Sequence, residues 1–314
     1  MIARPTRSDL SLLLILALMW GTSYAFIKLG VQTLPTFTLI ASRLAIGLAF
    51  LMAVVIAARE PLPRGPRIYG HLIVMAAINI VIPFTLITWA EQSVDSALAA
   101  ILNGALPLIV IFLAALVFND EPITLNRLGG LIVGYIGVIV LVGPGLAGAV
   151  SGSGFTGELA LLGSTVAYAI GAVYSRKMIR GLRPMIPAVF QVGFAFLMVL
   201  VLAFAFEQPL AVQWNTDALI AVLWLGLLGS GAAYLLNFRL LTRIGATATS
   251  QLAYLLPVVG IVTGALMFGE TIDARVAIGT GLVLGGVALV NSRFGQRRLF
   301  GRAAPDPASR AATR

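Results

Sequence analysis

Two stretches of this chain repeat one another at a fixed spacing of 150 residues. Residues 102–120 align with residues 252–270 without a gap, and both stretches lie in long apolar segments. The matched pairs are Leu102 and Leu252, Leu106 and Leu256, Pro107 and Pro257, Ile111 and Ile261, Ala115 and Ala265, Leu116 and Leu266, Phe118 and Phe268, and the two acids Asp120 and Glu270. An apolar chain built of two related halves is typical of membrane transporters with internal repeats.

The composition places both halves in a membrane. Hydrophobic residues make up 59% of the 314 positions, charged residues make up 11%, and the mean hydropathy is +1.00. A water-soluble protein needs more polar material than this to cover its surface. The net charge of +9 would suit nucleic acid. Membrane orientation explains the same charge better, so we expect no nucleic-acid partner.

The residue inventory indicates no cofactor. The chain has no cysteine and a single histidine, His71, so disulfides and thiol ligands are excluded and a histidine-based metal site is not expected. It also lacks a glycine-rich phosphate loop with Lys and Ser or Thr, so we do not expect ATP hydrolysis to supply the energy.

Ten apolar segments are long enough to cross a bilayer, which takes roughly 20 helical residues. They are predicted at 10–32, 36–58, 68–89, 95–118, 126–143, 157–178, 186–206, 216–240, 247–268 and 274–292. The first begins like a signal peptide, but its apolar run is long enough to span and no A-x-A-like cleavage site follows, so we interpret it as a retained helix. The predicted domains are a five-helix repeat over 10–143, a linker over 144–156, a second repeat over 157–292 and a basic tail over 293–314.

The distribution of positive charge predicts the orientation. With the N-terminus in the cytoplasm, all of the 21 Lys and Arg residues except Lys28, Arg43 and Arg275 fall on the cytoplasmic side, as the positive-inside rule requires. Because each repeat has an odd number of helices, the second enters the membrane from the opposite face. The sequence therefore predicts an all-α polytopic membrane protein of two inverted five-helix repeats, with both termini cytoplasmic and the solute site near the midplane.

Short sequence patterns add a family resemblance. The first span carries Ala17-Leu18-Met19-Trp20-Gly21 and the second carries Ser42-Arg43-Leu44-Ala45, while the Pro107 and Pro257 segments each end near an acidic residue before a glycine-rich helix. The pattern resembles the EamA repeats of the drug/metabolite transporter superfamily, and within it the exporters of aromatic amino acids. The first repeat departs from the second where Asn119-Asp120-Glu121-Pro122 stands against Gly269-Glu270-Thr271, so its acidic position is ambiguous by one residue.

The resemblance implies a function and a site. It implies alternating-access export of amino acids and related metabolites from the cytoplasm, across the inner (plasma) membrane. It also implies a central cavity lined by spans 1–4 and 6–9, with spans 5 and 10 at the periphery.

Polar side chains inside the spans are the first candidates for that site, because burying them in hydrocarbon is costly. Arg43 lies about two turns into the second span, where a charge costs roughly 3 kcal/mol. A guanidinium suits a solute carboxylate; the alternatives are snorkelling and bonds to backbone carbonyls. Gln191 matches Arg43 at a shift of 148 and is expected to be its counterpart in the second half. Lys28 is expected to snorkel to the membrane surface.

Aromatic and amide side chains complete the predicted cavity. Trp20 and Tyr168 lie mid-span, where a residue of the interfacial belt is not expected. Aromatic walls suit a flat apolar solute with polar ends, although packing alone explains them equally. The predicted solute-binding residues are Trp20, Tyr24, Arg43, Asn79, Asn103, Tyr168, Gln191, Tyr234, Asn237, Gln251 and Tyr254. Pro83, Pro107 and Pro257 free backbone carbonyls and are predicted hinges, with Trp89 as a gate or belt residue.

Glycines and acids bear on assembly and coupling. Gly130-x-x-x-Gly134 and Gly281-x-x-x-Gly285 have the spacing of close helix packing, and contacts within the bundle are favoured over a dimer interface. We therefore expect a monomer or a weak homodimer. No Asp or Glu is placed well inside a predicted span, and Glu91 is assigned to an outer helix end, so the sequence indicates no coupling ion.

Three rival interpretations remain open. The same fold would also carry drugs or other metabolites. A lipid-modifying intramembrane enzyme would need catalytic groups at membrane depth. The candidate nucleophiles Ser23, Ser42, Ser164 and Ser250 have no His, and no acid away from a helix end, in their spans, so enzyme activity is not expected. A channel is the third interpretation. The expected partners are a small-molecule solute and the lipid bilayer.

Overall fold

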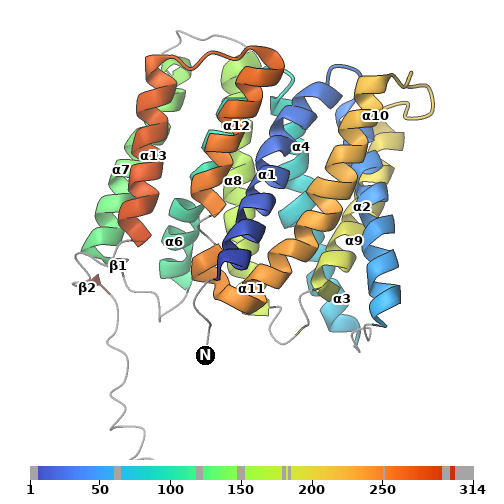
Figure 1. Ribbon diagram of the computed structural model, residues 1–314, viewed down its shortest axis with the longest axis horizontal. Helices are drawn as coiled ribbons and strands as arrows, with labels where there is room; N and C mark the ends of the chain where they lie inside the picture. Colours follow the sequence, from blue (N-terminus) through green and yellow to red (C-terminus); the bar gives the residue numbers. More distant parts are fainter. Residues whose placement is uncertain are drawn as a thin grey trace, which may run out of the picture.

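A bundle of ten helical segments forms the described part of the chain (Figure 1). The computed structural model describes residues 6–59, 65–117, 123–146, 153–178, 182, 185–249, 252–291 and 298–300. Eight segments are long and apolar enough to span a membrane, and the shorter apolar helices Leu252–Phe268 and Ala274–Val290 complete the ten. The protein is therefore an all-helical, multi-pass membrane protein, as the sequence predicts.

Seven of the segments are single helices. They are α1 (Arg7–Gly30), α2 (Thr36–Ala58), α7 (Leu125–Leu146), α8 (Ser153–Met178), α9 (Met185–Phe206), α12 (Leu252–Phe268) and α13 (Ala274–Asn291). At its start, α1 has a capping box in which Thr6 and Asp9 bond to each other's backbone N–H.

Three segments are interrupted. The third consists of α3 (Pro66–Ala76), the π-helix η1 (Ala77–Val81) and α4 (Ile82–Ala90); the fourth of α5 (Ser96–Gly104) and α6 (Leu106–Val117); the eighth of α10 (Thr216–Leu223), the π-helix η2 (Trp224–Ala232) and α11 (Ala233–Thr249). Two short strands, β1 (Ile123–Thr124) and β2 (Arg298–Phe300), pair antiparallel.

The predicted ends of the eighth and ninth segments need correction. The eighth was expected to end at residue 240 but continues to Thr249, and the ninth begins at Leu252 rather than at 247. Gly245, the only turn-forming residue in between, stays helical because one glycine costs a helix only about 1 kcal/mol.

The two halves run in opposite directions. The Lys28 ammonium in the last turn of α1 donates to the Val94 carbonyl at 2.7 Å, and a β-carbon at Gly157, near the start of α8, would lie 2.5 Å from the Val94 side chain. The end of α1 and the start of α8 therefore share one end of the bundle, called the upper end and drawn uppermost in Figure 1. Since α1 opens the first half and α8 the second, this is the arrangement of an inverted repeat.

The pair α7 and α13 stands at one edge of the bundle (Figure 1), where the resemblance places spans 5 and 10. Glycine lets the two backbones touch, because a β-carbon at Gly130 would lie 2.6 Å from the Gly286 carbonyl oxygen. The Gly130 pattern thus packs within the bundle. The second pattern does not, because a β-carbon at Gly281 or at Gly285 meets nothing within 4 Å.

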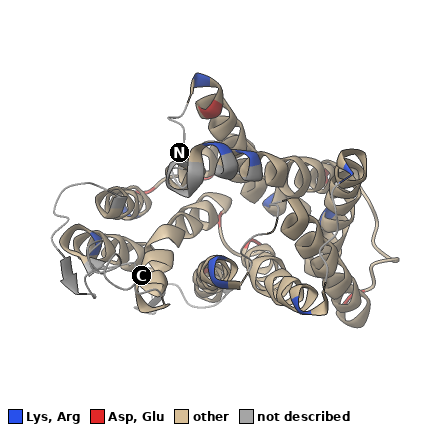
Figure 2. Ribbon diagram, turned by 90° about the horizontal axis from the view of Figure 1, so that it is seen from below, with Lys and Arg blue, Asp and Glu red and all other residues tan. Residues whose placement is uncertain are grey.

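Apolar side chains cover much of the outside as well as the core. Leu116, Val201 and Leu266 are 68%, 68% and 80% exposed. Charged positions are few against the helices seen from below (Figure 2). A surface this apolar is stable in contact with lipid tails and not in water.

Candidate functional site

One buried arginine marks the centre of the bundle. Arg43 on α2 is 4% exposed. Its guanidinium carbon lies 4.3 Å from the centroid of the Phe84 ring on α4, and its Nε donates to Ser230 Oγ on η2 at 3.3 Å. Within the described part of the chain, neither terminal guanidinium nitrogen has a protein acceptor. Since a guanidinium carries five N–H donors, Arg43 retains donors for a molecule that is not the protein.

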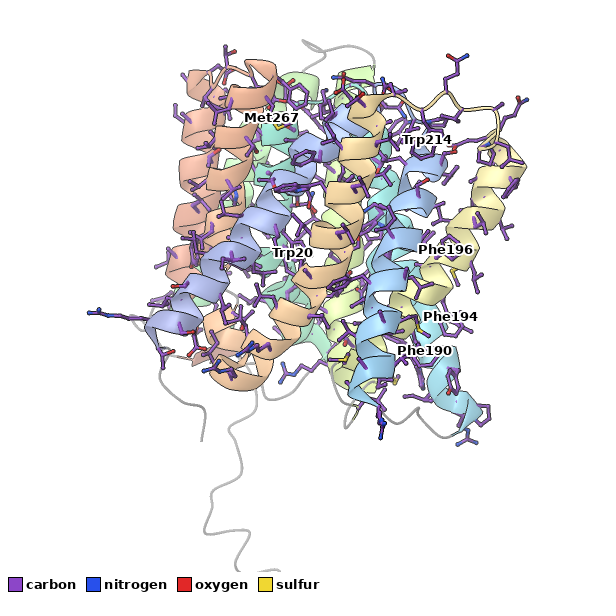
Figure 3. All side chains as sticks on the ribbon, turned by 45° about the vertical axis from the view of Figure 1, so that its right-hand side comes forward. Trp20, Phe190, Phe194, Phe196, Trp214 and Met267 are labelled. Carbon is purple, nitrogen blue, oxygen red and sulfur yellow. The ribbon has the colours of Figure 1, made fainter. Side chains whose placement is uncertain are left out.

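Aromatic side chains gather around this arginine. The Trp20 indole N–H donates to the Gly229 carbonyl at 3.1 Å, and the Trp20 ring meets Tyr234 edge-on with centroids 6.1 Å apart. Figure 3 shows Trp20 on α1 at mid-height of the bundle. The phenols of Tyr24 and Tyr168 lie within electrostatic range of the guanidinium. The structure thus brings together five predicted residues, which we call the Arg43 cluster: Trp20, Tyr24, Arg43, Tyr168 and Tyr234.

A second polar pair occupies the related position in the other half. Gln191 on α9 is 5% exposed, and its Oε1 accepts from Asn79 Nδ2 on η1 at 3.2 Å. Asn79 packs against Gly171 of α8, where any β-carbon would overlap its side chain. Gln191 therefore bonds to a π-helix of the first half, just as Arg43 bonds to a π-helix of the second.

The two π-helices lie where the halves meet. η2 belongs to the second half and packs on α2 of the first, while η1 belongs to the first half and packs on α9 of the second. A two-fold axis in the membrane plane produces this crossed pairing. Pro83 explains the wider turn of η1, because it has no N–H for the Asn79 carbonyl. Single π-turns are frequent at functional sites.

The family follows from comparison with known proteins. The sequence matches the EamA-like transporter family over residues 8–143 and again over residues 155–292. The chain belongs to this family. It is a membrane transporter whose two EamA matches together cover most of its length.

Individual relatives of this EamA-like protein are named as transporters without a stated solute. It is 24% identical over 282 residues to the uncharacterized transporter YoaV of Bacillus subtilis, covering 90% of this chain and 96% of YoaV. It is 26% identical over 277 residues to the uncharacterized inner membrane transporter YedA of Escherichia coli, covering 88% of each. A solved crystal structure matches with a TM-score of 0.64 and 21% identity over 91% of this chain and 96% of that chain, which shows a shared fold.

Among the remaining predicted site residues, Asn103 links two helices of the EamA-like bundle. Its Nδ2 donates to the Ala99 carbonyl at 3.1 Å. Its Oδ1 accepts from the hydroxyls of Ser164 and Thr165 on α8 at 3.3 and 3.4 Å. Asn103 is 6% exposed, and its hydrogen bonds join α5 to α8.

The other predicted residues are half-buried, exposed or outside the described part of the chain. Asn237 and Tyr254 are half-buried on α11 and α12. Gln251 lies outside the described residues. Trp89, at the upper end of α4, is 45% exposed, as a residue of an interfacial belt would be.

The three prolines differ in their local structure. Pro83 follows η1 at the start of α4, and Pro107 follows the break between α5 and α6. Pro257 instead lies within the uninterrupted helix α12, close to Gly104 of α5. Breaks therefore accompany Pro83 and Pro107, and a hinge role for all three stays a prediction.

At the upper end, two carboxylates accept hydrogen bonds from the first turns of helices in the other half. We call these two sets of contacts the Glu270 clasp and the Glu207 clasp. Glu270, just after α12, accepts from the backbone N–H groups of Ser96 and Ala97 at 2.9 Å each, and from the Ser96 hydroxyl at 2.9 Å. This clasp joins the end of a second-half helix to the first turn of α5. A carboxylate there satisfies unpaired N–H groups and faces the positive end of the helix dipole.

The Glu207 clasp repeats the arrangement on another helix pair. Glu207, just after α9, accepts from the backbone N–H groups of Phe37 and Thr38 at 2.8 Å each, and from the Thr38 hydroxyl at 2.7 Å. It joins α9 to the first turn of α2. Both clasps connect one half to the other at the same end of the bundle, which is where a gate between the halves would open.

We expect Glu270→Gln to loosen the upper end. The amide is neutral and loses charge-assisted hydrogen bonds, a loss of about 2 kcal/mol. Because the chain has no cysteine, a thiol at the buried position Val94, introduced as Val94→Cys, reports opening by its rate of labelling with a membrane-impermeant maleimide. That rate should rise about tenfold or more in Glu270→Gln. The matched control is Asp217→Asn, an exposed acid at the same end; equal rates in the two variants would contradict the gate.

Several contacts at the candidate site were not predicted from the sequence. Ser230 looks like a packing residue among glycines, and its contact with Arg43 depends on how α2 is placed. The repeat did single out Glu270, but its partners lie 173 and 174 residues away in sequence. Lys28 bonds to the Val94 carbonyl in the turn at the upper end, and its snorkelling stays a prediction. Asp120 and Glu121, which align with Glu270, lie outside the described residues.

Proposed function

We propose that this EamA-like transporter exports amino acids by alternating access, with Arg43 binding the carboxylate of the solute. The observation that carries the proposal is the buried guanidinium whose terminal nitrogens have no acceptor in the described part of the chain. A buried cation is stable when an anion pairs with it. A carboxylate fits the two parallel N–H groups of a guanidinium.

Aromatic amino acids are the favoured cargo. The Phe84 ring lies 4.3 Å from the guanidinium carbon, and the Trp20 and Tyr234 rings pack against each other; these rings offer planar apolar surfaces to an aromatic side chain. Polyamines are disfavoured, because the positive charge of Arg43 repels a polycation. Drugs and other metabolites that carry a carboxylate remain the alternative cargo on the same fold.

The upper end is proposed to face the outside of the inner membrane, with both termini in the cytoplasm. The lower end carries most of the cationic side chains of the described helices, among them Arg7, Arg59, Arg67, Arg176 and Arg243. Cytoplasmic loops carry such an excess. The similarity to YedA, named as an inner membrane transporter, agrees with this location.

One chain supplies both halves of the proposed pathway, so a monomer is sufficient. The repeats over 10–143 and 157–292 would rock against each other about the midplane. The Glu207 and Glu270 clasps would hold the outer side closed in the conformation seen here and release when the halves tilt.

Counterflow in proteoliposomes tests the proposal. Vesicles loaded with unlabelled tryptophan, phenylalanine, threonine or spermidine are diluted into the matching radiolabel. Transient accumulation of labelled amino acid, strongest for the aromatic pair and reduced in Trp20→Ala, is the expected result. No counterflow with any amino acid, in protein that elutes as a single folded species, would overturn amino-acid transport. Rapid equilibration that does not saturate would indicate a channel.

A further inference from the structure

A carboxylate without a partner is buried at the upper end. Glu91, in the turn that follows α4, is 0% exposed. Within the described part of the chain, neither of its carboxylate oxygens has a hydrogen-bond partner. The sequence assigned Glu91 to an outer helix end, and in the fold it is fully buried there.

An ionised carboxylate is unfavourable in this position. Removing the charge from water carries a large desolvation cost, which only a paired cation or several hydrogen bonds would offset. Burial raises the pKa of the Glu91 carboxyl well above its ordinary range, and the Lys28 ammonium offsets only part of the effect. Burial therefore favours the protonated form of Glu91 while the upper end is closed.

Charged groups face Glu91 from the neighbouring helices. Lys28 and the Tyr24 phenol face it from α1, Arg43 from α2, and Glu270 from the end of α12. Lys28 does not form an ion pair with Glu91 within the described residues, because its ammonium bonds to the Val94 carbonyl. The negative charge of Glu270 lies nearby and opposes ionisation of Glu91.

Helix α8 packs on α4 without supplying a partner. Glu158, next to the Gly157 contact, is itself acidic and lies 3.8 Å from the Arg275 guanidinium. Asp95, before α5, is acidic as well. Lys28 thus bonds to the Val94 carbonyl, while Arg275 bonds to the Leu141 carbonyl and lies near Glu158 and Asp273. Among the described residues, Glu91 has no counter-charge in contact.

A proton suits this position better than a metal ion. Hard metal cations bind several oxygen ligands at once. The described residues contain no group of three His, Asp or Glu side chains that would hold a metal. A proton needs only the single carboxyl.

We propose that Glu91 is the proton-binding site through which this transporter exchanges an incoming proton for its outgoing solute. The inference rests on the proposed transport function and adds the coupling ion to it. The carboxylate takes up a proton from outside water while the upper end is open. It gives the proton up to cytoplasmic water that reaches it past Tyr24 and Arg43 when the lower end opens, and no other bond is made or broken.

The position of Glu91 links proton binding to the gate. It lies in the turn between α4 and α5, shortly before Val94, which accepts from Lys28, and Ser96, which the Glu270 clasp holds. Closing these contacts shuts out outside water and favours the protonated carboxyl; opening of the lower end then admits cytoplasmic water, in which the carboxyl ionises and releases the proton. A proton taken from outside thus favours closure of the outer side, which is the return step of an exporter.

Transport with and without a pH gradient tests the proposal. Vesicles with an acidic lumen are given the radiolabelled amino acid that showed counterflow, and the wild type should accumulate it above the medium concentration. Glu91→Gln should keep counterflow without a gradient, within about twofold of wild type, and lose gradient-driven accumulation. Asp217→Asn, an exposed acid at the same end, should behave as wild type. Accumulation unchanged in Glu91→Gln, or counterflow lost in it, would overturn the proton site.

A spectroscopic measurement keeps the two proposals separable. Infrared spectra of the purified protein at neutral pH should show the stretching band of a protonated carboxyl that is missing in Glu91→Gln and present in Asp217→Asn. If the wild type shows no counterflow with any amino acid, the proposed cargo fails, and this band alone decides the proton site. Identical carboxyl bands in wild type and Glu91→Gln would overturn it whatever the solute.

Discussion

Arg43→Met is expected to abolish high-affinity solute binding without destabilising the protein. Methionine keeps a long apolar side chain but removes the donors for a carboxylate, a loss of about 3 kcal/mol or about 100-fold in affinity. Replacing a buried charge by an apolar side chain of similar size is often neutral or stabilising. The half-saturating concentration in counterflow should therefore rise about 100-fold while the melting temperature in detergent stays equal or increases.

Arg43→Lys separates charge from geometry. Lysine keeps the positive charge but cannot form two parallel hydrogen bonds, so we expect an intermediate loss of about tenfold. A melting temperature that falls by several degrees in Arg43→Met would show that Arg43 is needed for folding. Unchanged affinity in both variants would remove Arg43 from the solute site.

Gly130→Val is expected to destabilise the bundle more than any substitution in the Arg43 cluster. The added β-carbon would lie 2.6 Å from the Gly286 carbonyl oxygen and 2.7 Å from the Val290 nitrogen. Both are backbone atoms, so α7 and α13 would have to separate. A loss of roughly 3 kcal/mol or more is expected, seen as a lower melting temperature and a smaller monodisperse fraction in detergent.

Gly281→Val is the matched control. It makes the same chemical change in α13, but a β-carbon there meets nothing within 4 Å. Its melting temperature should stay close to that of the wild type, within about 0.5 kcal/mol of stability. Equal destabilisation by both valines would mean that helix propensity, and not contact between α7 and α13, sets the effect.

Local sequence patterns were sufficient to predict the membrane segments, because the transfer of a segment into lipid depends on its own composition. Ten segments could therefore be placed from apolar runs, and the repeat about Pro107 and Pro257 gave the two halves. Turn chemistry set most boundaries within a few residues. It failed at Thr249, because a lone glycine does not stop a helix.

The spacing of residues along one helix does not predict which face of that helix contacts a neighbouring helix. The Gly130 and Gly281 patterns have the same spacing, yet only Gly130 contacts a neighbouring backbone, because that depends on how α7 and α13 are rotated. Glu91 follows a predicted span and was assigned to an outer helix end. It is buried because α1, α8 and the end of α12 close around the turn that holds it.

The sequence by itself determined that this protein is a membrane bundle of two related halves, because hydropathy and internal repetition are properties of the chain alone. It also identified Arg43 as a charged side chain within a predicted span, where burial of the charge is costly and a functional role is therefore expected. Only the tertiary structure decided which side chains meet: Arg43 with Ser230, Gln191 with Asn79, Glu270 with the start of α5. These contacts join residues far apart in sequence, and their existence depends on the relative placement of helices, which no local pattern specifies.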